Sequence, residues 1–171
     1  ANKDIESAIS IYQQIIHLLP ERLDIQEKLA ELFISISDTQ SATSQYITLA
    51  KLLTESDKIL QSEFFLEKAL KLSPESDEIH KELINIYIKQ NKINKAVELL
   101  HHSLNKMNNP QQKKATLNAL IALEPENIDW WSLKAEIEME LGQKDNSIEC
   151  YKSILNIQEN NNALEEVCLT L

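Results

Sequence analysis

The stretch from Asp77 to Lys106 constrains the fold of this chain more than any other part of the sequence. Its apolar residues recur every three or four positions in two runs, the spacing that gives an α-helix one buried face. The first run comprises Ile79, Leu83, Ile86 and Tyr87, and the second comprises Ile93, Ala96, Val97, Leu99, Leu100 and Leu104. Only Gln90-Asn91-Lys92 separates the runs, so the stretch is predicted to fold back as an antiparallel helical hairpin.

Such a hairpin keeps apolar residues on its outer faces and needs similar neighbours to cover them, as in a helical repeat array. The stretch resembles a tetratricopeptide repeat, whose unit is 34 residues long. The matching positions are His80, Leu83, Ile84 and Tyr87 in the first helix, Ala96, Leu100 and Ser103 in the second, and Pro74 at the end of the preceding unit. The sequence departs from the family pattern at His80 (usually tryptophan), Ile84 (usually glycine) and Asn108 (where a proline is expected).

Weaker copies of the pattern cover most of the rest of the chain. They are carried by Ala8, Tyr12, Ile15 and Pro20, by Leu29, Ala30, Phe33, Ala42 and Tyr46, and by Trp131, Ala135, Gly142, Ser147, Tyr151 and Ile154. The intervals from Pro20 to Pro74 and from Pro74 to Pro125 each exceed one repeat by about one helix. We therefore expect a single right-handed α-solenoid domain over residues 1–171, with about ten helices, two of which break the 34-residue register. The second odd helix is expected at 111–123.

The expected end of the array has several details. Gly142 should stop a helix over 126–141, because glycine readily adopts the left-handed cap conformation. Asp145 should cap a helix over 146–157, and a separate short helix should close the chain at 160–170. The residues expected to face inward are Ile148, Tyr151, Ile154 and Leu155, with Val167, Leu169 and Leu171 forming the apolar face of the last helix. Trp131 is expected in the core, whereas Trp130 either contacts the helix at 111–123 or is an exposed binding anchor.

The composition excludes several classes of fold and function. A single glycine, four prolines and 5% aromatic residues disfavour a sheet protein, which needs turns between its strands. The net charge of −10 and the single arginine, Arg22, disfavour nucleic-acid binding. Residues 89–114 hold six lysines and only Glu98 as an acid, which indicates either a solvated face or a docking patch for an acidic partner. No apolar run is long enough to span a bilayer, and a cytoplasmic location is favoured.

No motif for catalysis, for a cofactor or for a metal ion is present. The adjacent His101 and His102 point about 100° apart on a helix, so they are not expected to share one ion. A phosphate-cradling loop needs more glycine than this chain has. Cys150 lies within an amphipathic pattern and is expected to be a small core residue. We therefore expect a protein that is not an enzyme.

The resemblance implies a module that binds a peptide or another protein in a concave groove lined by the first helix of each unit. The residues expected to line it are Glu31, Lys51, Lys81, Asn85, Ile88 and Glu136. Lys81 and Asn85 also resemble the start of the clamp by which tetratricopeptide co-chaperones hold a C-terminal carboxylate. The rest of that clamp is not matched in register, because the next helices offer Lys113, Lys114, Asp129 and Glu136.

Other functions stay open at this point. The chain begins Ala1-Asn2 without methionine, which suggests a fragment of a longer protein. It could be the docking arm of a larger enzyme, such as a glycosyltransferase, or a scaffold subunit in secretion or pilus assembly. Self-association through the ends of the solenoid is a further expectation, because end helices keep apolar faces.

Overall fold

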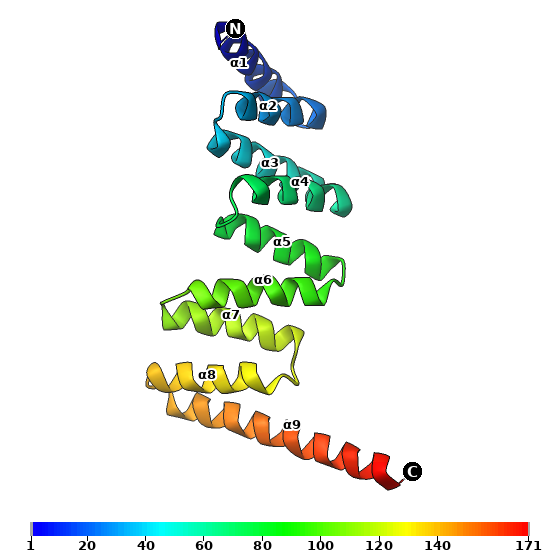
Figure 1. Ribbon diagram of the computed structural model, residues 1–171, viewed down its shortest axis with the longest axis vertical. Helices are drawn as coiled ribbons and strands as arrows, with labels where there is room; N and C mark the ends of the chain where they lie inside the picture. The colour runs from blue at the N-terminus through cyan, green and yellow to red at the C-terminus, as the bar shows by residue number, and fades with distance from the viewer. Residues whose placement is uncertain (1, 171) are drawn as a thin grey trace. The chain divides into compact units, whose positions relative to one another are not determined.

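The computed structural model describes the backbone of residues 2–170 and the side chains of residues 4–162. Within that range every regular element is an α-helix, and Figure 1 labels all nine. Their bounds are α1 (Asn2–Leu18), α2 (Leu23–Ser35), α3 (Thr39–Glu55), α4 (Ile59–Leu72), α5 (Asp77–Lys89), α6 (Ile93–Lys106), α7 (Pro110–Leu123), α8 (Ile128–Glu140) and α9 (Lys144–Thr170). The predicted all-α solenoid is confirmed.

The chain divides into two compact units, Ala1–Lys92 and Ile93–Leu171. The first holds α1 to α5 and the second holds α6 to α9, and in each unit every helix packs against the next along the chain. The expected single domain over residues 1–171 stays a prediction.

The core of the first unit begins where α1 meets α2 and α3. Leu29, Phe33 and Ala42 are buried together there, and Ile9, Tyr12, Ile16 and Leu72 pack against them. The core continues through residues that are almost completely buried, namely Leu49, Leu53, Leu66, Ile79, Leu83 and Ile86. Burial of each such side chain contributes about 1.5–3 kcal/mol, so the short helices of the unit are held by their neighbours.

Four connections between helices are tight turns with the same geometry. In each of them one residue adopts the left-handed conformation: Ser37 (φ 61°), Asp57 (φ 57°), Asn91 (φ 56°) and Gly142 (φ 75°). The next residue donates its backbone N–H to the carbonyl five residues upstream, from Asp38 to Phe33, Lys58 to Leu53, Lys92 to Tyr87 and Gln143 to Glu138, at 2.8–2.9 Å. This is the Schellman motif, which satisfies the last carbonyls of a helix. The expected stop at Gly142 is confirmed.

The first two of these turns account for the first odd helix. They join α2, α3 and α4 in immediate succession, so three helices lie between Pro20 and Pro74. The Asp38 side chain caps α3 by accepting a hydrogen bond from the Ser41 N–H (3.0 Å), as Ser37-Asp38-Thr39 predicts.

The second odd helix is α7, which lies within one residue of its expected range. Asn109 starts it, because its side-chain oxygen accepts from the N–H groups of Gln111 (2.9 Å) and Gln112 (3.3 Å). Pro110 occupies the first helical position, where its missing N–H costs no hydrogen bond.

Connections that contain proline use a different contact. Gln26 donates from Nε2 to the Pro20 carbonyl (2.7 Å), and Trp131 donates from Nε1 to the Pro125 carbonyl (2.8 Å). Both side chains come six residues after the proline, and the buried His80 stands at the same distance from Pro74. A side chain that can donate a hydrogen bond therefore recurs where the family pattern has tryptophan. Trp131 itself is half-buried rather than fully in the core.

The last helix differs from the prediction in where it begins and where it ends. Helix α9 begins at Lys144, so Asp145 lies in its first turn rather than at its cap. It runs without a break to Thr170, because residues 158–162 contain neither proline nor glycine to stop it. The expected tenth helix is the end of α9, and the side chains of Val167, Leu169 and Leu171 lie outside the described residues.

The inward face of α9 was also predicted wrongly in part. Ile154 is buried as expected, but Ile148, Tyr151 and Leu155 are 51%, 50% and 57% exposed. Small residues, Ser147 and Cys150, are buried with Ile154 in their place. The expected role of Cys150 as a small core residue is confirmed.

Candidate functional site

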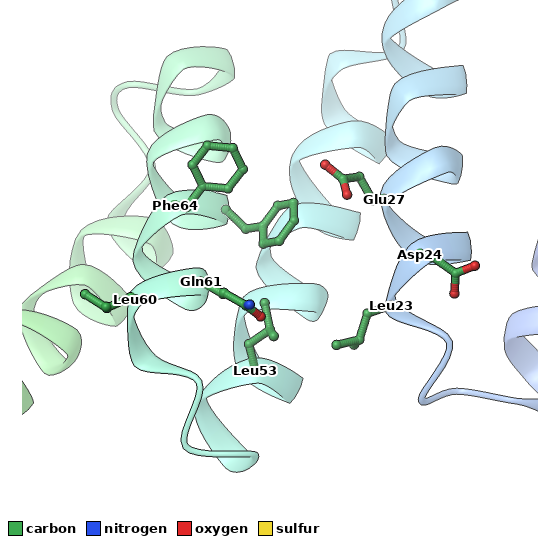
Figure 2. Close-up of a pocket in the computed structure, with 8 residues that line it drawn as sticks. Leu23, Asp24, Glu27, Leu53, Leu60, Gln61 and Phe64 are labelled. Atoms are coloured by element: carbon green, nitrogen blue, oxygen red, sulfur yellow. The ribbon is translucent and has the colours of Figure 1, made fainter.

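An open groove in the first unit combines apolar and charged side chains. Helices α2 and α4 form its sides and α3 contributes to its floor, giving a cavity of about 500 Å³. It is lined by Leu23, Asp24, Glu27, Leu53, Leu60, Gln61, Phe64 and Phe65. Figure 2 shows Leu23 and Glu27 on α2 facing Gln61 and Phe64 on α4, with Leu53 between them.

The exposure of the apolar residues makes this groove unusual for a folded surface. Phe64 is 51% exposed and Leu60 is 74% exposed, although both are large and apolar. Apolar surface that gathers in a groove marks an interaction site more often than single exposed residues do. The groove is therefore a candidate interaction site.

A cation and three aromatic rings lie together beside the groove, and two of the rings, those of Phe64 and Phe65, line it. The Nζ atom of Lys68 on α4 lies 4.6 Å from the ring centroid of Phe64, 5.2 Å from that of Phe65 and 5.5 Å from that of Tyr46. The same Nζ donates to Oε1 of Glu27 on α2 at 3.0 Å. We call these five residues the Lys68 cluster.

Acidic side chains of α2 border the groove and the Lys68 cluster. Arg22 donates two hydrogen bonds of 2.8 Å to Asp24 and holds the pKa of that carboxyl at about 2, well below its usual value. Burial raises the pKa of Tyr46, and the charges of Glu31 and Glu27 act in the same direction. The α2 side of the groove is therefore rich in carboxylates.

A second groove of the first unit is polar. It has a volume of about 500 Å³ and is lined by Thr39, Gln40, Thr43, Ser44, Ile47, Thr48 and Lys51 from α3, with Ser73, Ser76 and Glu78 at and before the start of α5. Lys51 Nζ lies 2.7 Å from Oε1 of Glu78 and 3.6 Å from Oε1 of Glu82, so it bridges α3 and α5. The hydrogen bond to Glu78 raises the pKa of Lys51.

The structure brings only some of the predicted site residues together. Lys51 lines the polar groove, whereas Lys81, Asn85 and Ile88 are exposed on α5 and line neither groove. Glu31 is exposed on α2 near Tyr46, and Glu136 is exposed on α8, in the other unit.

The sequence reasoning missed the apolar groove. Its signal was present at Leu60 and Phe64, one helical turn apart, and at the adjacent Phe65, beside the buried run of Ser62, Leu66 and Ala69. A helix with bulky apolar residues beside a face of smaller ones has more apolar surface than one neighbour can cover.

The lysines of residues 89–114 are not all available to a partner. Lys92 donates to both carboxylate oxygens of the buried Glu63 (2.8 and 2.7 Å). Lys114 pairs with Glu138 (2.9 Å) and also donates to Gln143 (2.8 Å). Two of the six lysines therefore tie helices together.

The second unit has its own polar groove of about 360 Å³, lined by Lys114, Trp131, Lys134, Glu138, Asn146, Glu149, Cys150 and Ser153. Burial raises the pKa of the Cys150 thiol, so it stays protonated at neutral pH and is a poor nucleophile. Trp130 donates to Glu124 (2.8 Å) and its ring lies 5.3 Å from that of His101 on α6. Trp130 is thus a half-buried packing residue that contacts Glu124, next to α7, and His101.

Two further findings concern other classes of site. Among the described residues, no group of three or more His, Cys, Asp or Glu side chains is placed to hold a metal ion. None of the described helices is both long and apolar enough to cross a bilayer.

Short helices that each pack against the next along the chain are the architecture of α-helical repeat proteins. Family comparison gives the particular family: the tetratricopeptide repeat pattern matches residues 53–117 and again residues 129–161. The chain belongs to the tetratricopeptide repeat family, whose members are interaction scaffolds.

Solved structures similar to this chain include tetratricopeptide proteins. The crystal structure of MamA is 16% identical, with 95% of this chain and 93% of MamA covered and a TM-score of 0.35. YrrB, described as a TPR protein with an unusual peptide-binding site, is 13% identical over 94% of this chain and 98% of its own, with a TM-score of 0.35. BtubC from P. vanneervenii is 15% identical over 94% and 92%, with a TM-score of 0.36. No curated protein matches the chain. These identities and TM-scores are too low to transfer a function.

Proposed function

We propose that this chain is a non-catalytic interaction module that binds a segment of a partner protein in the groove between α2 and α4. The observation that carries the proposal is an open groove of about 500 Å³ in which Phe64 is half exposed. Cavities of roughly 300–1,000 Å³ are the size of typical ligand sites. The family contributes the expectation that the ligand is a protein.

The shape of the groove favours a peptide over a small molecule. It is open to solvent, and its walls come from side chains on two alternate helices, α2 and α4. Apolar anchors from a bound segment would lie against Phe64 and Leu23, while Gln61 and the Glu27 carboxylate offer polar contacts at the rim. Peptide-binding grooves combine apolar anchor sites and polar rims in this way.

A peptide-display selection against the folded chain tests the proposal. Selected peptides are expected to lose binding by about tenfold or more with Phe64→Glu, because the new charge faces the apolar anchor. The matched control is Ile34→Glu, which changes an exposed apolar residue of α2 that does not line the groove. Equal binding by both variants, with helicity unchanged, would show that the groove is not the site.

A second candidate site is the exposed face of α5, where Lys81 and Asn85 lie one turn apart. The observation that favours it is that both side chains are exposed on α5, the helix whose Glu78 lines the polar groove. The combined change Lys81→Glu and Asn85→Ala would then abolish binding of a peptide with a free C-terminal carboxylate. The same peptide with an amidated C-terminus is the control, and equal binding of the two peptides would exclude this site.

A further inference from the structure

The Lys68 cluster has the geometry of a site for an ammonium group. The rings of Tyr46 and Phe65 are stacked with centroids 5.9 Å apart, and Phe64 meets Phe65 edge to face at 5.2 Å. Their faces surround Nζ of Lys68 at 4.6–5.5 Å, within the range in which an aromatic face attracts a cation. Glu27 adds a carboxylate at 3.0 Å.

Exposure differs across the cluster. Tyr46 is buried at its base, whereas Phe64 is half exposed and the Lys68 side chain is 30% exposed. Three cluster residues, Glu27, Phe64 and Phe65, also line the apolar groove. The ammonium position therefore opens toward the same groove in which the proposed partner would lie.

In the structure the ammonium position is occupied by the protein's own Lys68 side chain. Lysine ends in a compact charge on a flexible stem, so Lys68 can rotate into solvent without moving its helix. Replacement of Lys68 by a second ammonium group would restore the same contacts, so the exchange changes the electrostatic energy little. Apolar residues next to the incoming cation would then add contacts with Phe64 and Leu23.

On the basis of the function proposed above, we propose that the Lys68 cluster is an alkylammonium site at which a partner's lysine side chain, methylated or not, replaces Lys68. The carboxylates of Glu27 and Glu31 on α2 give the charge complementarity for this cation. An acidic segment would instead be repelled by these carboxylates at the rim of the groove. When no partner is bound, the Lys68 ammonium group keeps the three rings and Glu27 of the Lys68 cluster together.

The experiment uses tetramethylammonium chloride as a probe, with neopentyl alcohol as its uncharged counterpart, at constant ionic strength. Binding to the folded chain is followed through the NMR signals of Tyr46, Phe64 and Phe65. Lys68→Ala removes the ammonium group from the Lys68 cluster. The matched control is Lys71→Ala, which removes an exposed lysine from the same helix. Two double variants test the other members of the cluster. Lys68→Ala combined with Glu27→Gln tests the carboxylate, and Lys68→Ala combined with Phe64→Ala tests one of the three rings.

We expect tetramethylammonium to bind Lys68→Ala about tenfold more tightly than it binds the unchanged chain or Lys71→Ala. Removing Glu27 or Phe64 should reverse that gain, and neopentyl alcohol should bind more weakly than the cation. Equal affinity of the cation for all three proteins, or equal binding of the alcohol and the cation, would overturn the inference. Groove peptides that bind without any cationic side chain would also overturn it, while leaving the proposed function intact.

Discussion

At the scale of single residues, two buried carboxylates hold neighbouring helices together. Glu63 of α4 accepts from Lys92 and Gln90 after α5, and Glu138 of α8 accepts from Lys114 of α7. Removing one partner of such a pair is costly, because the other charge is left buried without compensation. Neither pairing was evident from the sequence, since nothing in helical spacing distinguishes Glu138 from its exposed neighbours Glu136 and Glu140.

Lys114→Ala is expected to destabilise the second unit by about 3 kcal/mol, because Glu138 is only 1% exposed and loses its counter-charge. Denaturation followed by tryptophan fluorescence measures this effect. The control is Lys152→Ala, which removes an exposed pair with Glu149 and should cost less than about 1 kcal/mol. Similar costs for the two variants would contradict the prediction, and Lys114→Met with Glu138→Leu should recover most of the loss.

Asp24, at the rim of the apolar groove, gives a prediction about pH. Its pKa is about 2 in the folded chain, below the ordinary value of 3.8, chiefly because Arg22 donates hydrogen bonds to it. A lowered pKa means that the pair contributes stability above about pH 4 and loses it as pH falls toward 2. An NMR titration of the Asp24 carboxyl should give a midpoint near 2 that rises toward 3.8 in Arg22→Ala. An unchanged midpoint in that variant, or an equal rise in the exposed-lysine control Lys28→Ala, would refute this assignment.

At the scale of helices, the left-handed turns decide where four of them end, namely α2, α3, α5 and α8. Of the four residues in the left-handed conformation, Gly142 alone adopts it without steric cost. Ser37, Asp57 and Asn91 each carry a side chain that makes this conformation less favourable. Turn chemistry was therefore readable from the sequence at Gly142 and less so at the other three. The two odd helices were predictable because the intervals between Pro20, Pro74 and Pro125 indicate how many helices lie between them, even where the repeat pattern is weak.

Gly142→Ala is expected to destabilise the second unit by about 1 kcal/mol. An added Cβ would meet no atom within 4 Å, so the cost arises from the backbone conformation (φ 75°) alone. Ser37→Gly should have the opposite sign in the first unit, since it relieves a side chain at φ 61°. Denaturant midpoints of the two variants provide the measurement, and shifts of the same sign would contradict it.

Helices α4 and α9 show why the buried faces were harder to predict than the helices. In α9 the face with Ser147, Cys150 and Ile154 is buried, and the bulkier face with Ile148, Tyr151 and Leu155 is exposed. Helical spacing identifies both faces as apolar but does not say which one meets the neighbour. Small residues allow two helices to approach closely, so the smaller face packs inward and the bulkier one stays available. The apolar groove follows from the same choice in α4, whereas the sequence favoured Lys81 and Asn85 through their resemblance to a carboxylate clamp. Self-association through the ends of the solenoid stays a prediction.

At the scale of the whole molecule, the chain comprises two compact units, and helices in such arrays are stabilised mainly by their nearest neighbours. Both tryptophans, Trp130 and Trp131, lie in the second unit, so fluorescence reports on that unit whereas circular dichroism reports on every helix. The two signals are expected to give different transitions, since a repeat array need not unfold in two states.

Leu49→Ala and Leu117→Ala test this independence, because both leucines are fully buried, one in each unit. Each should cost about 3 kcal/mol where it lies. Leu49→Ala should shift the circular dichroism transition and leave the fluorescence transition in place, whereas Leu117→Ala should shift the fluorescence transition. A fluorescence shift of equal size in both variants would show that the chain unfolds as one cooperative domain, as the sequence led us to expect.

The succession of α2, α3 and α4 through two tight turns has a consequence for valency. Different pairs of alternate helices form the two grooves of the first unit. Helices α2 and α4 form the sides of the apolar groove, and α3 and α5 contribute to the polar one. Because the two grooves share no lining residue, we expect a ligand in one of them to leave the other accessible. Two partners of unlike chemistry held in this way would meet at a local concentration far above their bulk concentrations, even without touching each other when free.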